Sequence, residues 1–495
     1  MKRFLYSLLF LCACLSLHAE VKYVFYFIGD GMGPNQVLAT EMYLAELNGQ
    51  IGRERLFMTH LPYSGQLATF SASNGITDSS AAGTALATGS KTNNGTLGLN
   101  AQGDTLTSIA EQLKAEGWGV GLLTTVAIDH ATPAAFYANV KSRDDYYEIG
   151  RQLAYTNFDF FGGAGFHRPT PKKSDDKKDG KKDKNSKKDK KDGKKAKKAK
   201  KAAAGPNLYD LAEEQGYTIA SGMKQAMEKS KEAEKMILVQ PTEGIDRSKK
   251  GSNFPYRIDG RDEELSLKIL TSFATDFLQK NHDRFFLMVE GGMIDYACHG
   301  RDGATAIQET LDFDAAIGFA LDFYESHRDE TLIIVTADHE TGGMALGNSD
   351  YTLDLQLLQH QHCSAGTLSD ELNELYKDNR QPEWKEVRAL LEKRLDLYTD
   401  VTVEEDEDAE LQAVFRKTVE KRDEADVKTL YKDINALGNA AVALLDKKAK
   451  MGWTSYGHTA AAVPIFAIGK GAERFSGWQD NTDVVPKILR ITHRK

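Results

Sequence analysis

The sequence predicts an α/β fold: a three-layer sandwich with a central, mostly parallel sheet flanked by helices, plus a helical insertion. Short apolar runs rich in β-branched and aromatic residues recur along the chain, and helical patterns lie between them. Polar residues follow where these runs end. Strands that alternate with helices are typical of parallel sheets covered on both faces.

The predicted strands are apolar throughout, as expected of strands buried on both faces. The first, VKYVFYFI over residues 21–28, ends in the turn sequence GDGMG. Pro34 then opens a helical pattern that runs to about Leu47, in the favoured first-turn position. A further helix is predicted over residues 305–324, and further strands over 119–125, 285–289, 332–336 and 464–468.

Two segments interrupt the predicted domain, which spans residues 20–495. The lysine-rich segment 168–205 has almost no apolar residues, so we expect a disordered, mobile surface loop, with contact to anionic surfaces as the alternative. Residues 347–451 are helical in pattern, in PEWKEVRALLEKRLDLY and ELQAVFRKTVEKRDEADVKTLYKDINALGNAAVALL. We interpret this second segment as a helical cap or an interface insertion.

The first 19 residues have the pattern of a signal peptide. Lys2 and Arg3 precede the apolar run FLYSLLFLCACLSL, and Ala19 is a small residue at a plausible cleavage point. The protein is therefore expected to be exported, to the periplasm or the extracellular space. A retained membrane anchor, or lipid attachment at Cys12 or Cys14, is the alternative. No later segment is apolar for long enough to predict a membrane span.

The charge and the cysteine content argue against a nucleic-acid-binding protein and against a disulfide-rich one. The formal net charge is -9 although residues 172–201 are dense in lysine, so the rest of the chain is more acidic still. An acidic body argues against nucleic acid as a partner. After cleavage only Cys298 and Cys363 would remain, which is no disulfide framework, and the sequence leaves their pairing open.

Side chains able to bind metal ions follow each predicted strand, or precede the last one. In an open α/β sheet, ligands gather outside the carboxyl ends of the strands, so we expect these side chains to meet there. In chain order they are Asp30, His130, Thr132, Glu290, Asp295, His299, Asp338, His339 and His458.

Several of these residues also have a plain structural explanation. Asp30 in GDGMG could simply shape a turn. Asp338 and Glu290 end strongly apolar strands, where an unpartnered carboxylate is costly, so a ligand role is favoured, and a hard carboxylate such as Glu290 suits Mg²⁺.

Asp295 and His299 are four residues apart, which places both on one helix face and suits a shared metal ion, although such pairs are also common on helix surfaces. His458 in TSYGHTAA, taken alone, would be an ordinary polar residue. The whole set is more specific than any member.

Ser79 opens a helical pattern within DSSAAG. A helix N-terminus presents unpaired N–H groups and a partial positive charge, which suit a phosphate. Ordinary helix capping by the Asp-Ser pair is the alternative, although capping needs no such run of small residues. Arg143, in NVKSRDD, could be solvated or could bind two phosphate oxygens at once.

The sequence resembles the alkaline phosphatase family through six motifs: FIGDGMG, TDSSAAGTALATGSKTNNGTLG, HATPAAFYANVKSR, VEGGMIDYACH, VTADHETGG and YGHT. Their order and spacing agree with the family and cover nearly all of the predicted sheet domain, from Asp30 to His458, but neither insertion. The resemblance implies an enzyme that hydrolyses phosphate monoesters to an alcohol and inorganic phosphate through a covalent phosphoserine.

The resemblance also implies roles for particular residues. Ser79, directly after the aspartate, would be the nucleophile rather than Ser80, and Arg143 would clamp the phosphate. Two zinc ions and one magnesium ion are implied, with these ligands: Asp295, His299 and His458 for the first zinc; Asp30, Asp338 and His339 for the second; and Glu290, Thr132 and the bridging Asp30 for magnesium.

Two positions depart from residues found in some members of the family. His130 stands where some bacterial members have Asp, although other members also have His, and Tyr296 stands where Lys or His is often found. Both are expected to lie just outside the metal ligands, where they would influence the magnesium site and the water around the phosphate.

The expected partners are small phosphomonoesters and inorganic phosphate, with no nucleic-acid recognition. A homodimer is left open. The enzymatic alternatives are a phosphodiesterase and a sulfatase, but a sulfatase needs C/S-x-P-x-R around its nucleophile, and phosphodiesterases generally lack the magnesium ligands and the counterpart of Arg143. A non-catalytic protein that binds phosphate or metal is the alternative from a different class.

Overall fold

The computed structural model describes residues 20–171, 205–239, 253–260, 266–347, 350–377, 380–420 and 426–493. The predicted signal peptide, residues 1–19, lies outside the described residues. So does most of the predicted lysine-rich loop, residues 172–204. Within the described ranges, no helix has an apolar stretch long enough to cross a membrane.

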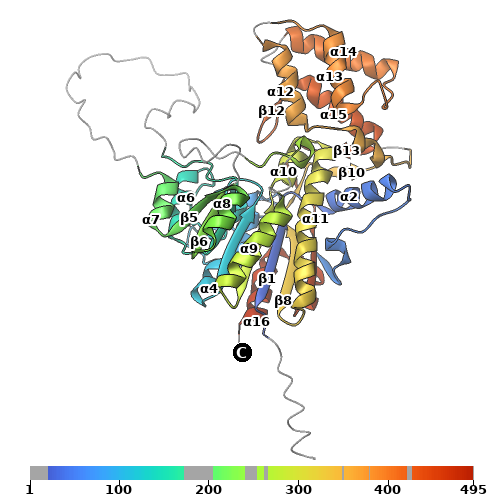
Figure 1. Cartoon of the computed structure of the whole chain (residues 1–495). Helices are drawn as coiled ribbons and strands as arrows, with labels where there is room; N and C mark the ends of the chain where they lie inside the picture. Colours follow the sequence, from blue (N-terminus) through green and yellow to red (C-terminus); the bar gives the residue numbers. More distant parts are fainter. Residues whose placement is uncertain are drawn as a thin grey trace, which may run out of the picture.

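A ten-stranded sheet forms the centre of the fold, in the order β16-β2-β15-β8-β1-β7-β3-β4-β6-β5 (Figure 1). Neighbouring strands run parallel, except that β15 is antiparallel to both β8 and β2. The predicted α/β sandwich with a mostly parallel sheet is therefore confirmed. The strands are β1 (Tyr23–Gly29), β2 (Tyr63–Ala68), β3 (Gly119–Thr124), β4 (Phe160–Gly163), β5 (Tyr217–Ser221), β6 (Lys235–Val239), β7 (Phe285–Gly291), β8 (Thr331–Ala337), β15 (Val463–Gly469) and β16 (Gly477–Asp480).

Helices cover both faces of the sheet because alternate side chains of a buried strand point to opposite faces. On β1, Phe27 packs against Phe313 of α11, whereas the Tyr26 hydroxyl on the other face donates to the backbone oxygen of Leu86 in α3, 3.3 Å away. Helices α9 and α11 therefore form one outer layer, and α3, α4 and α16 belong to the other. The helices of this domain are α2 (Pro34–Leu47), α3 (Ser79–Thr88), α4 (Ile109–Ala115), α5 (Ala131–Ala134), α6 (Tyr146–Tyr155), α7 (Leu208–Glu214), α8 (Gly222–Lys229), α9 (Leu267–Asn281), α10 (Met293–His299), α11 (Gly303–Ser326) and α16 (Val484–Thr492).

A group of helices from the insertion rises above the carboxyl end of the sheet (Figure 1). They are α12 (Ala365–Leu375), α13 (Trp384–Leu395), α14 (Glu405–Glu420) and α15 (Ala436–Lys448), preceded by the 3-10 helix η4 (Leu355–His360). The two ends of this segment are held together because β10 (Met344–Leu346) pairs antiparallel with β13 (Met451–Trp453).

One part of the insertion is not helical as predicted. Residues between α14 and α15 form a small antiparallel hairpin of β11 (Val427–Lys428) and β12 (Asp433–Ile434). The Thr429 hydroxyl donates to the backbone oxygen of Lys432 (2.6 Å) and accepts from its backbone nitrogen (3.2 Å). Such side-chain bonds compete with the helical backbone and favour a turn, which is why the helical pattern fails here. The next helix restarts at Asn435, whose side chain caps α15.

Candidate active site

Three carboxylates meet at the carboxyl edge of the sheet because of the strand register. β1 pairs with β8 so that Gly29 lies beside Ala337, and the next residues, Asp30 and Asp338, therefore leave the sheet side by side. Glu290 stands near the end of β7, on the other side of β1. All three are fully buried. Burial raises the pKa of Asp30 and Asp338 well above the usual range, and that of Glu290 to about 7.

A histidine and an aspartate on α10 face this edge, and a second histidine reaches them from far along the chain. Asp295 and His299 lie one helical turn apart, with Oδ2 of Asp295 3.4 Å from Nε2 of His299. His458 arrives because β14 (His458–Thr459) pairs antiparallel with β9 (Glu340–Thr341), directly after His339. The rings of His339 and His458 stack with centroids 3.6 Å apart.

The imidazoles are oriented by hydrogen bonds on their outer nitrogens. Nδ1 of His299 donates to the backbone oxygen of Tyr456 (2.5 Å), and Nδ1 of His458 to that of Thr77 (2.9 Å). The proton on Nδ1 leaves Nε2 of each ring with a lone pair, and these two Nε2 atoms are only 3.2 Å apart. At this distance the two nitrogens need either a proton on one of them or a cation near both.

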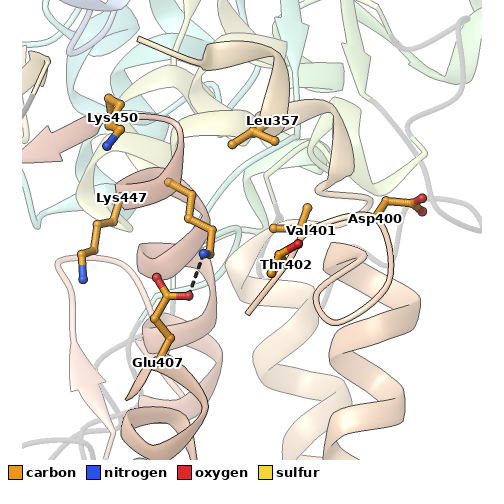
Figure 2. A pocket seen from close by; sticks show the side chains of 8 residues that line it. Leu357, Asp400, Val401, Thr402, Glu407, Lys447 and Lys450 are labelled. Atoms are coloured by element: carbon orange, nitrogen blue, oxygen red, sulfur yellow. Dashed lines mark ion pairs between the residues drawn. The ribbon is translucent and has the colours of Figure 1, made fainter. Parts of the chain in front are cut away.

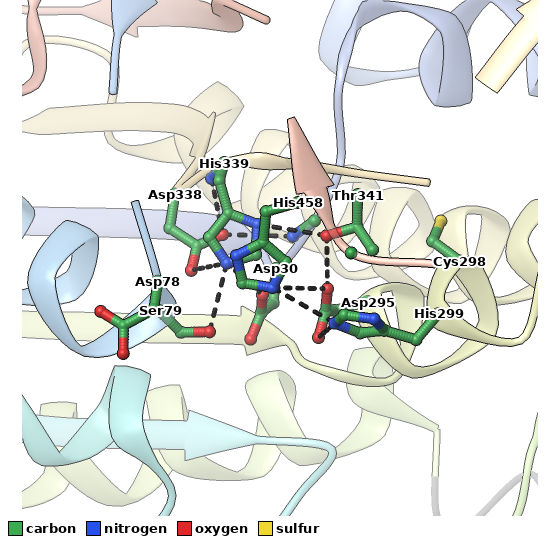
Figure 3. Close-up of polar contacts among 12 residues, drawn as sticks. Asp30, Asp78, Ser79, Asp295, Cys298, His299, Asp338, His339, Thr341 and His458 are labelled. Carbon is green, nitrogen blue, oxygen red and sulfur yellow. Dashed lines mark hydrogen bonds and ion pairs between the residues drawn. The ribbon is translucent and has the colours of Figure 1, made fainter. Parts of the chain in front are cut away.

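The side chains divide into three groups, and within each group the possible ligand atoms lie within 4.8 Å of one another. Figure 3 shows Asp30, Asp295, His299, His339 and His458. Asp30 and Asp295 each belong to two of the groups. The groups are Asp295, His299 and His458; Asp30, Asp295 and His339; and Asp30, His130 and Glu290. Asp338 adjoins the second group, with Oδ2 3.2 Å from Nε2 of His339.

Buried polar atoms without hydrogen bonds show that these groups suit cations. Of the buried side-chain atoms that lack a hydrogen bond in the described part of the chain, seven lie at this edge of the sheet: Oδ1 and Oδ2 of Asp30, Nδ1 and Nε2 of His130, Oγ1 of Thr132, Oε1 of Glu290 and Oδ2 of Asp338. Buried polar groups are rarely left unpartnered, and carboxylates least of all. A set of oxygen and imidazole ligands of this kind fits divalent metal ions.

Asp295 is stabilised by nearby histidines and a hydroxyl donor. Burial would raise its pKa, but His299, His458 and His339 lower it well below the usual range, so the group is ionised. The Thr341 hydroxyl donates to its Oδ1 at 2.5 Å. Gly31 makes room for it: the glycine has φ of +72°, and a Cβ there would lie 2.9 Å from the Asp295 Cα.

Ser79 is the first residue of α3 and is fully buried. Its hydroxyl oxygen lies 3.2 Å from Nε2 of His339, among the possible cation ligands. Asp78 caps the helix by accepting from the backbone nitrogen of Ala81 (2.9 Å). The run of small residues lets α3 pack closely on α5, since a Cβ at Gly83 would lie 3.1 Å from that of Ala135. The serine thus stands at a helix N-terminus, which favours anions.

Arg143 lies beside the start of the same helix. Its Nη1 is 3.3 Å from Oδ2 of Asp78, and its side chain is 16% exposed. Burial would lower the pKa of Arg143, but Tyr431 and Asp78 raise it above its usual range, so the guanidinium stays charged. A tethered, charged guanidinium next to a helix N-terminus can bind the oxygens of an anion.

His130 and Tyr296, the two positions singled out in the sequence, lie close to the ligand groups. His130 is buried, and burial with the charge of Arg143 lowers its pKa to about 3, so the ring is neutral. The sequence predicted His130 just outside the metal ligands, whereas the structure places it within the third group of possible ligands. The ring of Tyr296 lies 6.0 Å from that of His130.

Sequence reasoning missed three residues that support this site. Asp78, which ties Arg143 to α3, could have been found from the capping pattern. Thr341 follows His339 by two residues in VTADHETGG, a motif in which only Asp338 and His339 were considered as site residues. Tyr431 comes from the insertion, where the helical pattern gave no signal for it. Its hydroxyl donates to Oδ2 of Asp295 at 2.9 Å.

The two cysteines that would remain after cleavage are not bonded to each other. Cys298 and Cys363 are both buried free thiols. Cys298 stands one residue before His299 on α10, and the side-chain nitrogen of Gln36 donates to its sulfur at 3.8 Å.

Groups of possible cation ligands beside a helix N-terminus are what a metal-dependent hydrolase of phosphate esters requires, and the fold with this arrangement is typical of that class. A family model agrees: the one described as "Alkaline phosphatase" matches residues 21–493. The chain belongs to the alkaline phosphatase family, and as a member it is a phosphoric monoester hydrolase.

Individual relatives match over nearly the whole chain. Alkaline phosphatase 4 of Bacillus subtilis is 30% identical over 476 residues, which cover 96% of this chain and 89% of the relative. The crystal structure of a cold-active alkaline phosphatase from Shewanella sp. superposes with a TM-score of 0.74 at 26% identity, covering 96% of this chain and all of that one. A mutant of the TAB5 alkaline phosphatase with Mg bound in the M3 site shares the fold, with a TM-score of 0.61, 23% identity, and 96% and 98% coverage.

Proposed function

We propose that this chain hydrolyses phosphate monoesters through a covalent phosphoserine at Ser79, with two zinc ions and one magnesium ion. One observation carries the proposal: the Ser79 hydroxyl lies 3.2 Å from Nε2 of His339, at a helix N-terminus and within groups of buried carboxylates and imidazoles. A nucleophile, anion donors and cation ligands thus meet at one point.

The ligand groups divide naturally between the two kinds of metal ion. Groups that contain imidazole nitrogen suit zinc, whereas oxygen ligands suit magnesium. We assign one zinc to Asp295, His299 and His458; the second to Asp30, Asp338 and His339; and magnesium to Asp30, Thr132 and Glu290, with His130 adjoining. The TAB5 mutant with Mg in its M3 site is a precedent in the same fold.

When bound, the paired zinc ions would lower the pKa of a coordinated hydroxyl and of water, and would stabilise the negative charge of the leaving oxygen. The residues of the chain supply the rest. Ser79 Oγ passes its proton to solvent and forms a bond to phosphorus as the bond to the alcohol oxygen breaks, and the alcohol leaves with a proton from solvent. Water then attacks the phosphoserine, the bond between Oγ and phosphorus breaks, inorganic phosphate leaves, and Ser79 Oγ regains a proton from solvent.

Arg143 and the first turn of α3 would hold the phosphoryl group during both steps. A phosphate monoester dianion repels nucleophiles, so its hydrolysis depends mainly on positioning and electrostatic stabilisation. The guanidinium can grip two non-bridging oxygens at once, and its contact with Asp78 fixes it relative to Ser79.

The contacts of the two neighbouring serines favour Ser79 as the nucleophile. The Ser80 hydroxyl donates to Oδ2 of the capping residue Asp78 at 2.6 Å, which turns it away from His339. Only Ser79 of this pair faces the cation ligands. This choice is independent of the family motif.

We also propose that the enzyme acts outside the cytoplasm after cleavage near Ala19. The signal pattern of residues 1–19 supports export, and the family match begins at residue 21. Small phosphomonoesters would be its substrates.

Hydrolysis of a simple aryl phosphate by residues 20–495 tests the proposal. Activity should fall on chelation and return only when Zn²⁺ is added back, with Mg²⁺ giving a further increase. The same assay with a phosphodiester separates the main alternative: a faster diester would contradict a monoesterase. A protein that binds zinc but turns over neither ester would contradict catalysis altogether.

A further inference from the structure

The hairpin of the helical insertion brings an aromatic side chain to a proposed zinc ligand. Tyr431 lies between β11 and β12, and its hydroxyl donates to Oδ2 of Asp295 at 2.9 Å. Its ring lies parallel to that of Tyr296, with centroids 3.5 Å apart and planes 3° apart.

Both oxygens of Asp295 therefore receive a hydroxyl donor. Thr341 donates to Oδ1 at 2.5 Å, and Tyr431 donates to Oδ2. The carboxylate belongs to two of the three ligand groups. A rotation of this one side chain would change the geometry of both groups.

The hairpin is itself held in place by the rest of the insertion. The Lys432 ammonium donates to Oδ2 of Asp370 (2.7 Å) and to the backbone oxygen of Gly366 (3.1 Å), both on α12. Ile434 of β12 is buried. The neighbours of Tyr431 are thus attached to a helix, which gives its hydroxyl a defined position.

We propose that Tyr431 is a positioning residue that orients Asp295 for metal binding and thereby couples the helical insertion to the catalytic edge of the sheet. The proposal rests on the assignment of Asp295 as a zinc ligand. Residues that hydrogen-bond to metal ligands commonly control affinity, and their loss typically weakens metal binding about 10- to 100-fold.

Tyr431→Phe is the direct test, because it keeps the stacked ring and removes only the hydroxyl. Tyr398→Phe is the matched control: Tyr398 lies in the same insertion and donates to Oδ1 of Asp408 at 2.6 Å. Zinc affinity is measured on each full-length protein by competition with a coloured chelator. We expect about 10-fold or greater weakening of zinc binding for Tyr431→Phe and no change for Tyr398→Phe.

The result that would overturn the proposal is a zinc affinity of Tyr431→Phe equal to that of the parent. Equal weakening in both variants would do the same, because it would point to a general loss of stability. At saturating zinc, Tyr431→Phe should recover most of its kcat, since the residue acts through Asp295. If the parent binds zinc but hydrolyses no ester, the proposed function fails while the zinc comparison still tests Tyr431.

A separate cluster of possible metal ligands lies within the insertion, outside the site described above. Nδ1 of His360 and Nε2 of His362 each lie 2.9 Å from Oδ2 of Asp396. Ligand atoms of His360, Asp396 and Asp400 all lie within 4.8 Å of one another. The two contributing segments are joined by a backbone hydrogen bond from His362 to Arg394, at 2.9 Å.

The surroundings leave this cluster accessible. His362 is nearly half exposed. Asp400 borders a cavity of 630 Å³, and Figure 2 shows its carboxylate on the side away from Lys447 and Lys450. Lys448, which also lines the cavity, forms an ion pair with Glu407 at 2.6 Å. Two imidazoles and two carboxylates form a ligand set that suits zinc and similar transition ions better than calcium or magnesium.

We infer that His360, His362, Asp396 and Asp400 form an auxiliary site for a divalent transition-metal ion, which would tie η4 to the end of α13. The alternative is that the two histidines serve only as partners of Asp396.

Equilibrium dialysis against a range of Zn²⁺ concentrations separates the two explanations. The double variant His360→Ala/His362→Ala should bind one zinc ion per chain fewer than the parent, with ester hydrolysis unchanged. His493→Ala is the control, because it removes another surface pair of histidine and carboxylate, 2.8 Å from Glu116. If parent and double variant bind the same number of zinc ions with the same affinities, the auxiliary site is disproved.

Discussion

The hydroxyl oxygen of Ser79 lies 3.2 Å from Nε2 of His339, at the first turn of α3. One residue later, the Ser80 hydroxyl turns toward the capping carboxylate of Asp78. Two adjacent serines thus have different environments: one faces the cation ligands, and the other faces the helix cap. This difference gives the sharpest test of the proposed mechanism.

Ser79→Ala should abolish phosphoenzyme formation and lower kcat by roughly 1,000-fold or more, because no other hydroxyl takes its place. Zinc content should be unchanged. Ser80→Ala, the matched control, removes a hydrogen bond worth about 1 kcal/mol of stability and should retain most activity. Acid-quenched samples labelled with radioactive phosphate measure the intermediate. A labelled serine that persists in Ser79→Ala would show that the nucleophile is misassigned.

Arg143→Ala should lower kcat/KM on the order of 100-fold, because it removes a charged donor to the phosphoryl oxygens. Arg143→Lys keeps the charge but loses the two-pronged geometry, so an intermediate effect is expected. Steady-state kinetics with an aryl phosphate, together with inhibition by inorganic phosphate, distinguish the cases. Unchanged phosphate affinity in Arg143→Ala would exclude the clamp.

His130→Asp should shift the third ligand group toward magnesium. The change replaces an imidazole nitrogen with a carboxylate oxygen beside Asp30 and Glu290, and oxygen ligands suit Mg²⁺. Activity of the metal-stripped protein is titrated with Mg²⁺ at fixed zinc. The Mg²⁺ concentration for half-maximal activation should fall in the variant. An equal or higher concentration would show that His130 does not govern this group.

Chelation should lower the melting temperature of the protein markedly. Without cations, Asp30, Asp338 and Glu290 are buried near one another with unpartnered oxygens, which is an unfavourable arrangement. Metal ions that bind only the folded chain stabilise it by mass action, by about 4 kcal/mol at a concentration 1,000 times Kd. Differential scanning calorimetry with and without chelator measures the effect. A melting temperature insensitive to chelation would argue against metal binding at these carboxylates.

Stability should also depend on pH through Asp314, which belongs to none of the ligand groups. Its carboxylate accepts hydrogen bonds from the backbone nitrogens of Phe57 (2.8 Å) and Met58 (2.9 Å), and burial raises its pKa to about 6. The usual value in an unfolded chain is about 3.9. The folded state therefore binds this proton more tightly, so the contribution is fully present below about pH 4 and is lost as the pH rises through about 6.

A shift of about two units corresponds to roughly 3 kcal/mol over that interval. Asp314→Asn removes the titration. The free energy of unfolding is measured with urea at pH 4 and at pH 7. Over this interval the parent should lose about this amount of stability, and the variant should not. Parallel pH profiles would show that Asp314 has an ordinary pKa.

Much of the sheet could be predicted because its central strands carry a strong local signal. The run 21–28, for example, is apolar on both faces, and the register of β1 with β8 then puts Asp30 beside Asp338. β2, β4, β5, β6 and β16 were not predicted. β2 and β16 are partly exposed and so lack a continuous apolar run, and β4, β5 and β6 are only four or five residues long.

The position of His458 beside the other ligands depends on a long-range strand pairing that no local sequence pattern predicts. Strands β9 and β14 are two residues long and pair across more than a hundred residues of insertion. The family motif YGHT pointed to His458, whereas composition and periodicity did not. Tyr431 had neither signal, since its neighbours form a turn through Thr429 inside a helical pattern.

The short ladder between β10 and β13 brings Leu346 directly opposite Met451, so the whole insertion leaves and rejoins the sheet domain at one place. An element attached in this way can lengthen, shrink or be exchanged between relatives without shifting the strands beneath it. This attachment has a consequence for protein engineering. A deletion variant in which residue 346 is joined directly to residue 451 would keep the ligand residues of the sheet domain but lose Tyr431, whose hydroxyl donates to Asp295. Trimmed enzymes of this kind should fold, yet need more zinc to work.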